Sequence, residues 1–367
     1  MRFPGFEGEW ERKKLGDVAK RINTKNHENK INLVFSNSAT QGIIFQVDYF
    51  DKNIANKSNL DGYYIVKPLN FVYNPRISAH AEVGAMSLNK TGEIGLVSPL
   101  YTVFKITDTS VDVLYIEALF SSKVWHSYIR SIANYGARDD RMSIKNEDFL
   151  TLSLKIPSIR EQQKIANFLN LIDERIQTQM KIIEELEKSL KGYCQLLIKS
   201  KVPNKKLRDC VYCYSSTLKG TDVLEKNEKY PVYGASGIIA YISTYQANEN
   251  AILIVKDGSG VGNVQYSENE FSIIGTLNYL KSKQGVNLKY VFYCLKYFDF
   301  QKYKVGSGIP HIYFKDYGEA LIFCPSLQEQ KGIEKMLSAM DRKLNIEKSL
   351  LISYQQQKKY LLQNLFI

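Results

Sequence analysis

The residues of this chain that could do chemistry are few, and none forms a complete catalytic set. The run Asp257-Gly-Ser-Gly-Val-Gly262 follows a strand-like segment and has the composition of a phosphate-binding loop. Such a loop needs a helix directly after it, because the N–H groups at the helix start must face the phosphate. The residues from Asn263 to Ile274 are instead typical of a strand. We therefore interpret the run as a hairpin turn.

Other short motifs are equally incomplete. Asn74-Pro75-Arg76 is similar to the Asn-Pro-Pro-aromatic signature of amino methyltransferases, but the second proline, the stacking aromatic residue and a cofactor loop are missing. Cys210-x-x-Cys213 has no second cysteine pair at zinc-binding spacing. The four histidines show no metal-ligand spacing either: His27, His80, His126 and His311. The sequence thus predicts no catalytic, cofactor-binding or metal-binding residues, and a chain that is not itself an enzyme.

A long internal repeat organises the elements that must carry any function. PSIREQQKIANFLNLIDERI begins at Pro157 and PSLQEQKGIEKMLSAMDRKL begins at Pro325, a constant 168 residues later. The identical positions include Ser158 and Ser326, Glu161 and Glu329, Gln162 and Gln330, and Asp173 and Asp341. A repeat of this length has to be interpreted before any local motif. It predicts two copies of one structural plan.

Each copy begins with helix-start signals. Ser158-x-x-Glu161 and its equivalent at Ser326 are capping boxes, in which the glutamate is expected to reach back to the serine N–H. A second start at Asn170, equivalent to Ser338, predicts a bend followed by a long helix. Apolar residues then recur in a seven-residue pattern typical of paired helices. We expect the pairing to use Ile176, Ile183, Leu186, Leu190, Leu344, Leu351, Tyr354 and Leu361.

The two long helices are predicted to pair as an antiparallel coiled coil, with Ile183, Leu186 and Leu190 opposite Leu351, Tyr354 and their neighbours. The alternative is that each helix packs only on its own domain. A helix face this apolar must be buried against another element, which favours pairing of the two helices. Because both copies come from one chain, the arrangement would have internal pseudo-twofold symmetry.

A globular segment precedes each helical repeat. Lys14-Leu-Gly-Asp17 and Lys206-Leu-Arg-Asp209 open the two segments, and each continues as strands, a helix and a polar loop. In the first segment the helix is expected from Val113 to Ile132. The order predicts an α+β fold used twice, with four parts. They are a globular domain (1–155), a helical spacer (156–200), a second globular domain (201–323) and a second helical spacer (324–367).

Composition agrees with an ordinary globular protein. The chain has 367 residues, of which 44% are hydrophobic, and a formal net charge of +11 spread thinly along its length. That excess permits binding to a polyanion such as nucleic acid without requiring it. No apolar run approaches the ~18 residues that span a membrane. The five scattered cysteines suit reduced thiols, and a cytoplasmic location is expected.

These features together resemble the specificity subunit of type I restriction–modification systems. The resemblance is carried by the two helical repeats, the two Lys-Leu-x-Asp starts and the stretch YPVYGASGIIAYI at residues 230–242. It implies two target recognition domains, each reading one half of a bipartite, asymmetric DNA sequence. It also implies, as partners, double-stranded DNA, two modification (methyltransferase) subunits and restriction (translocase and endonuclease) subunits.

Base readout favours arginine, lysine, asparagine and other polar residues on loops. By this chemistry the candidate DNA-binding residues are Asn74, Arg76, Arg138, Arg141, Lys219, Tyr233, Ser236, Lys256, Lys304 and Ser307. His311 is interpreted as a local structural residue beside Pro310. Two other classes of function remain open. One is a coiled-coil scaffold that binds only proteins, and the other is a single-chain DNA methyltransferase or nuclease with an unrecognised site.

Overall fold

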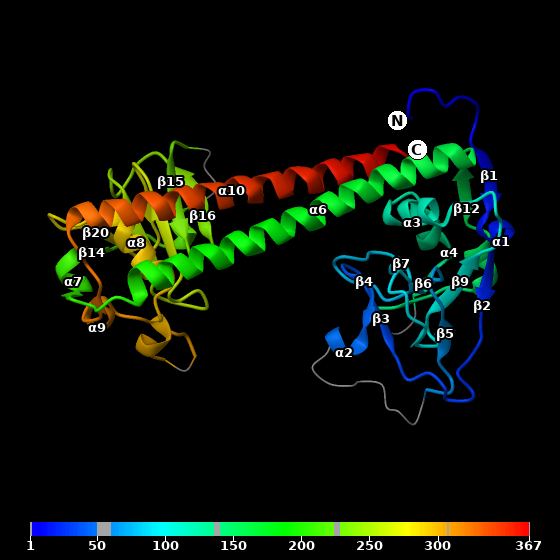
Figure 1. The fold of residues 1–367 in the computed structure, drawn as a ribbon, viewed down its shortest axis with the longest axis horizontal. Helices are drawn as coiled ribbons and strands as arrows, with labels where there is room; N and C mark the ends of the chain where they lie inside the picture. Colours follow the sequence, from blue (N-terminus) through cyan, green and yellow to red (C-terminus); the bar gives the residue numbers. More distant parts are fainter. Residues whose placement is uncertain (1, 50–59, 136–139, 224–227, 307, 367) are drawn as a thin grey trace. The chain divides into compact units, whose positions relative to one another are not determined.

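The computed structural model describes residues 2–49, 60–135, 140–223, 228–306 and 308–366 (Figure 1). The chain divides into two compact units. The first unit contains Met1–Thr178 and Leu351–Ile367, and the second contains Gln179–Leu350. Each unit therefore consists of one globular segment together with part of each long helix.

The central sheet of the first unit has the antiparallel strand order β2-β9-β6-β7. Its strands are β2 (Ala19–Ile22), β9 (Thr102–Ile106), β6 (Phe71–Asn74) and β7 (Ala85–Leu88). Four further antiparallel pairs surround this sheet: β1 (Glu11–Lys14) with β12 (Ser153–Ile156), β3 (Phe35–Ser38) with β4 (Gly42–Phe45), β5 (Tyr64–Val66) with β8 (Gly95–Val97), and β10 (Asn134–Tyr135) with β11 (Met142–Ser143). The short helices are α1 (Leu15–Val18), α2 (Gln46–Tyr49), α3 (Val113–Ser121), α4 (His126–Ile132) and α5 (Asn146–Leu150).

The second unit repeats this plan with the strand order β14-β20-β17-β18. These strands are β14 (Val211–Ser215), β20 (Leu277–Ser282), β17 (Ala251–Val255) and β18 (Val264–Ser267). A three-stranded sheet, β16-β15-β19, and one strand pair, β13 with β21, accompany them: β16 (Gly237–Ile242), β15 (Tyr230–Gly234), β19 (Ser272–Ile273), β13 (Lys205–Lys206) and β21 (Leu321–Ile322). The helices are α7 (Leu207–Cys210), η3 (Gly220–Asp222), α8 (Leu288–Lys296), η4 (Phe300–Tyr303) and α9 (Phe314–Tyr317). The α+β content expected from the sequence is present in both units.

The expected helix from Val113 to Ile132 is two helices, α3 and α4. The indole N–H of Trp125 donates to the carbonyl groups of Phe120 and Ser122, each at 3.0 Å. These carbonyl groups belong to the last turn of α3 and the residue after it, where helical partners run out. The tryptophan thus ends one helix and leads into the next.

The long helices are continuous, which corrects the expected bend. α6 runs from Ile159 to Cys194 and ends in a π-helical turn, η2 (Gln195–Lys199), while α10 runs from Leu327 to Asn364. Asn170 Nδ2 donates to Glu174 Oε1 at 2.8 Å, and Ser338 Oγ donates to Glu334 Oε1 at 2.6 Å. Because these side chains bond to glutamates within the helix, they do not cap a new helix start.

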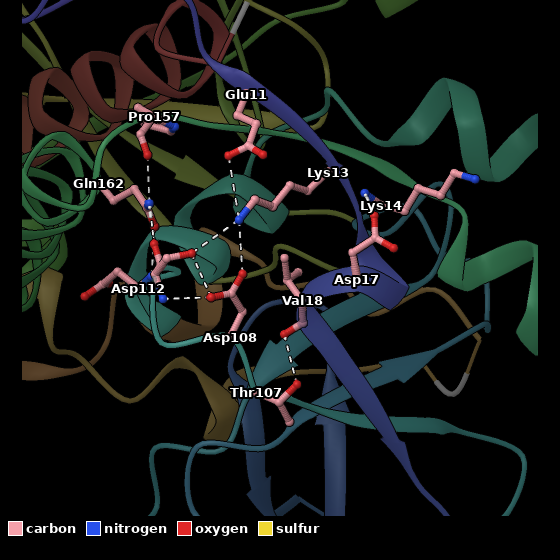
Figure 2. Close-up of polar contacts among 11 residues, drawn as sticks. Glu11, Lys13, Lys14, Asp17, Val18, Thr107, Asp108, Asp112, Pro157 and Gln162 are labelled. Carbon is pink, nitrogen blue, oxygen red and sulfur yellow. Dashed lines mark hydrogen bonds and ion pairs between the residues drawn. The ribbon is translucent and has the colours of Figure 1, made fainter.

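A buried glutamine joins the start of α6 to the residue that caps α3 (Figure 2). Gln162 Oε1 accepts the N–H of Asp112 at 2.8 Å, and its Nε2 donates to the carbonyl of Pro157 at 2.9 Å. Asp112 in turn caps α3 by accepting the N–H of Tyr115. In the second unit Gln330 binds the N–H of Asn287, at 2.9 Å, and the carbonyl of Pro325 in the same way. We call this arrangement the glutamine joint.

Expected capping boxes are present only in part. The N–H of Glu161 donates to Ser158 Oγ at 3.4 Å, and the N–H of Glu329 donates to Ser326 Oγ at 3.3 Å. The carboxylate of Glu161, however, accepts two hydrogen bonds from Arg2, at 2.8 and 2.7 Å. The buried glutamate therefore pairs with a charged guanidinium, which satisfies both of its oxygens.

Segments of both long helices complete the core of each unit. In the first unit Leu169 and Ile172 of α6 lie in one hydrophobic cluster with Leu361 and Leu365, and Phe366 follows α10 into the same cluster. In the second unit the corresponding cluster contains α6 residues Leu190 and Cys194, Ile198 of η2, and α10 residues Leu337 and Leu344. The apolar face of each helix is therefore buried against its unit, as an amphipathic helix requires.

Candidate nucleic-acid interface

Polar contacts between α6 and α10 define how the helical segments meet within each unit. In the first unit Lys358 Nζ lies 2.5 Å from Asp173 Oδ1, and the Arg175 guanidinium lies 5.0 Å from the centre of the Tyr354 ring. From the first of these contacts to the second, the residue number increases on α6, from 173 to 175, and decreases on α10, from 358 to 354. The two helical segments of this unit therefore run antiparallel.

In the second unit Gln179, which is 5% exposed, donates to Glu347 Oε2 at 2.5 Å. These two residues occupy equivalent positions in the repeat, 168 residues apart. A polar pair inside an apolar seam fixes the register of two helices, because any shift would leave buried polar atoms without partners.

The expected register of the seam needs correction. Ile183, Leu186 and Leu190 pack with Leu337, Met340 and Leu344 in the second unit. The residues predicted to face them, Leu351 and Tyr354, belong to the first unit, where Tyr354 contacts Arg175. Ile176 and Leu361 pack in the first unit's core. The heptad pattern alone does not determine register, which the polar contacts do.

The chain leaving β6 forms the first candidate site. Backbone hydrogen bonds of 2.8 and 3.1 Å join segments 75–77 and 140–142, so that Arg76 and Arg141 form an antiparallel bridge. The side chain of Arg76 is 63% exposed, and its Nε lies 3.2 Å from Asp140 Oδ2. We call this arginine pair the first bridge. It brings together two of the residues predicted to bind DNA.

A hollow of about 640 Å³ lies beside the first bridge. Its wall includes Gln46, Asn74, Arg76 and Tyr101. Burial raises the pKa of Tyr101, although the nearby arginines act in the opposite direction. The phenol therefore remains a protonated hydrogen-bond donor at neutral pH.

Two groups near this hollow are buried without a hydrogen-bond partner among the described residues: Gln46 Oε1 and Arg141 Nε. Buried polar atoms in folded proteins are nearly always paired, and each exception calls for an explanation. A partner from outside the chain would supply one.

The chain leaving β17 forms the corresponding site of the second unit. Hydrogen bonds of 3.0 and 2.9 Å join segments 256–258 and 310–312, and Asp257 and His311 form an antiparallel bridge. Asp257 Oδ1 lies 2.8 Å from His311 Nδ1, and the side chains are 30% and 37% exposed. We call this pair the second bridge. The hydrogen bonds that hold it match those of the first bridge donor for donor and acceptor for acceptor.

The second bridge was missed by sequence reasoning, which treated His311 as a local structural residue. Gly306 has a φ of +91°, and a Cβ there would lie 2.6 Å from the carbonyl oxygen of Ile309. Glycine is therefore required at this turn. The glycine-rich stretches at 257–262 and 306–308 were visible in the sequence, but the pairing of segment 256–258 with segment 310–312 was not.

Other predicted residues of the second unit also gather near this bridge. Backbone hydrogen bonds join Leu218 to Gly275, Tyr233 to Ile274 and Lys256 to Thr276. Lys219 and Lys256 thus approach one short segment, 274–276, together with Tyr233. Lys304 precedes Val305, whose backbone pairs with that of His311 at 2.8 and 2.9 Å. Ser236 is exposed in the turn between β15 and β16.

Three predicted residues stand apart. Asn74 is 9% exposed, and its side chain donates to the Asn37 carbonyl and accepts the N–H of Arg76, so it shapes the turn after β6. Arg138 and Ser307 lie outside the described residues.

The cysteines and histidines form no candidate metal site in the part of the chain that the structure describes. No group of three or more metal-ligating side chains that could hold a metal ion occurs there. Burial raises the pKa of Cys210 and of Cys213 to about 12, which keeps both thiols protonated and poorly reactive. No helix among the described residues is long and apolar enough to cross a membrane.

Comparisons with known proteins find a matching domain, similar sequences and similar folds. Residues 201–353 match the type I restriction modification DNA specificity domain. The chain is 25% identical over 127 residues to the EcoprrI specificity subunit of Escherichia coli, which is 34% of this chain and 32% of that protein. It is 26% identical over 247 residues, 61% of this chain, to a putative type I specificity subunit of Mycoplasma genitalium, of which 64% is covered.

Solved structures share the fold. A crystal structure of a type I restriction–modification S subunit from M. genitalium superposes with a TM-score of 0.66 at 18% identity, covering 100% of this chain and 97% of that one. A chain from a structural study of type I complex assembly and conformational transition gives a TM-score of 0.56 at 12% identity, covering 97% of both chains. The alignments with the two curated relatives cover 32% and 64% of those proteins. The matched domain and the similar proteins together support a specificity subunit of a type I restriction–modification system, and the solved structures show the shared fold.

Proposed function

We propose that each unit of this chain reads one half of a bipartite, asymmetric DNA target. The proposal rests on one observation: the same arrangement of strands and backbone hydrogen bonds occurs in both units, with different side chains at equivalent positions such as the two bridges. We call this shared arrangement the frame. Two similar frames with different surfaces suit two different half-sites. The net charge of +11 favours association with a phosphate backbone.

The long helices would set the distance between the half-sites. α6 has 36 residues and α10 has 38, so each is about 54 to 57 Å long at 1.5 Å per residue. Gln179 and Glu347 are repeat equivalents that contact each other. A residue contacts its own equivalent at a twofold axis, so a pseudo-twofold axis of the paired helices would pass through this contact.

The exposed helix faces would dock two modification (methyltransferase) subunits, and restriction subunits would join through that complex. In this proposal the chain recognises DNA and performs no chemistry of its own. Methyl transfer would then require a modification subunit.

Selection from a randomised DNA library tests the proposal directly. The purified full chain, alone and with its modification subunits, is expected to enrich one bipartite sequence. A radiolabelled methyl donor should give no transfer with the chain alone and adenine methylation at the enriched site once modification subunits are added. Failure to enrich any bipartite sequence would favour a protein-binding scaffold, and methylation by the chain alone would reveal an enzyme.

A further inference from the structure

The two bridges occupy the same place in their frames but offer opposite hydrogen-bonding chemistry. In the first, both side chains are arginines, which carry only donors. In the second, the Asp257 carboxylate holds Nδ1 of His311 at 2.8 Å. An ionised carboxylate only accepts, so Nδ1 carries a proton, and in the tautomer of the imidazole that has its single proton on Nδ1 the other nitrogen, Nε2, is an acceptor.

Donors and acceptors read different base edges. In the major groove guanine presents two acceptors, O6 and N7, that suit an arginine, while adenine and cytosine present exocyclic amino donors that suit an acceptor. A carboxylate is repelled by phosphates, so at a DNA surface it is favourable where it accepts from such an amino group. We propose that the bridges are where each unit distinguishes bases. The arginine pair selects guanine in one half-site, and the Asp257–His311 pair selects an amino-bearing base, adenine or cytosine, in the other.

The geometry of the first bridge supports this assignment. Arg76 Nε lies 3.2 Å from Asp140 Oδ2, a contact that orients the guanidinium, and the two Nη groups make no hydrogen bond to another described residue. A bidentate contact with guanine can use those two groups. Arg141 Nε is buried without a partner among the described residues, which a bound base or phosphate would relieve.

The geometry of the second bridge is equally fixed. The Val305 and His311 backbones exchange two hydrogen bonds, and the N–H of Gly258 donates to the Pro310 carbonyl at 3.0 Å. Both loops also turn through glycines with positive φ, at Gly258 and Gly306. Because the backbone holds both side chains, little conformational entropy is lost when the pair binds a base.

This inference rests on the proposed function, and one experiment separates the two. Randomised libraries would be selected with the full wild-type chain, with Arg76→Gln and with Asp257→Asn. Arg130→Gln is a matched control, since Arg130 is 50% exposed and paired with Glu82 in the first unit. Thermal unfolding of each variant establishes that it is folded.

The wild-type chain should select a guanine in one half-site and an adenine or cytosine in the other. Arg76→Gln should reduce the preference for guanine over the other bases about tenfold, at one position of the first half-site only. Asp257→Asn should reduce the preference for adenine or cytosine by a similar factor, at one position of the second half-site only. Arg130→Gln should change neither. If the wild type selects no bipartite site, the proposed function fails. If it selects one and both substituted chains keep its preferences, or lose affinity uniformly for all sequences, this inference is overturned while the proposed function stands.

Discussion

The glutamine joints and the bridges differ in how far the two units share the same side chains. Gln162 and Gln330 make equivalent buried hydrogen bonds to a capping residue and a proline carbonyl. The bridges, by contrast, share their backbone hydrogen bonds but not one side chain. A buried amide that satisfies two backbone groups tolerates little change, because its loss would leave both groups unpaired. A surface side chain held by backbone bonds can change freely, so recognition can diverge on a constant frame.

The largest expected effect comes from replacing one globular segment with the equivalent segment of a relative that has the same fold but different surface residues. Residues 15–155 replaced by the equivalent segment of a relative should change one half of the recognised target completely and leave the other half intact. Methylome sequencing of a host that carries the system would show this. A change in both halves would mean that the units do not read DNA independently.

A cavity in the second unit's core should destabilise that unit. Leu190 is 1% exposed, and Leu190→Ala should cost about 2–5 kcal/mol. The chain has two tryptophans, Trp10 and Trp125, both in the first unit, so their fluorescence reports that unit alone. Denaturation followed by circular dichroism should therefore shift while the fluorescence transition stays in place.

Glu184→Ala is the control for this cavity, because its side chain is 63% exposed on the same helix. It should change neither transition appreciably. Equal shifts of both signals in the Leu190 variant would show that the two units unfold together.

Removal of either glutamine joint tests whether the frames are equivalent. Gln162→Ala and Gln330→Ala should each destabilise their own unit by about 1–3 kcal/mol, since buried backbone groups lose their partners. The exposed neighbours Gln163 and Gln328 provide matched alanine controls. Clearly unequal losses from the two joints, measured by hydrogen exchange within each unit, would contradict their equivalence.

The smallest expected effect is an acid sensitivity that Asp108 gives to the first unit. Hydrogen bonds from Ser110 and Lys13 lower the pKa of Asp108 to about 2. The equivalent loop of the second unit, residues 283–287, which leads to the residue that caps α8, contains no carboxylate. Because the pKa of Asp108 is lower in the folded chain than its unfolded value near 4, ionisation of this carboxylate stabilises the folded state above about pH 4. That stabilisation is lost as the pH falls towards 2 and the carboxylate is protonated. Tryptophan-monitored denaturation should show a small advantage of the wild type over Asp108→Asn at pH 5 that vanishes near pH 2. An advantage that persists at pH 2 would contradict this origin.

Sequence reasoning succeeded where the signal was local or repeated. The 168-residue offset identified Gln162 and Gln330 as equivalent, and the apolar periodicity predicted both long helices. It failed where specific contacts made by a side chain or a loop decide the outcome. The Trp125 indole ends α3 through two carbonyl groups, which no helical propensity reveals.

The same limit applies to the candidate site. Asp257 and His311 are 54 residues apart, and only the backbone pairing of two loops brings them into contact. Arg76 and Arg141 could be proposed singly from their chemistry, but not as one bridge. Asn74 had suitable chemistry, yet its amide is used within the turn after β6.

Leu361, Leu365 and Phe366 lie in the core of the first unit, although they follow the whole of the second unit in the chain. A ribosome therefore delivers every residue of the second unit before it delivers the last apolar side chains that the first unit needs. The first unit begins earlier but finishes later, and during synthesis its open core stays exposed to the cell. Molecular chaperones that shield apolar surface on nascent chains would bind the incomplete core of the first unit, which is synthesised before the second unit.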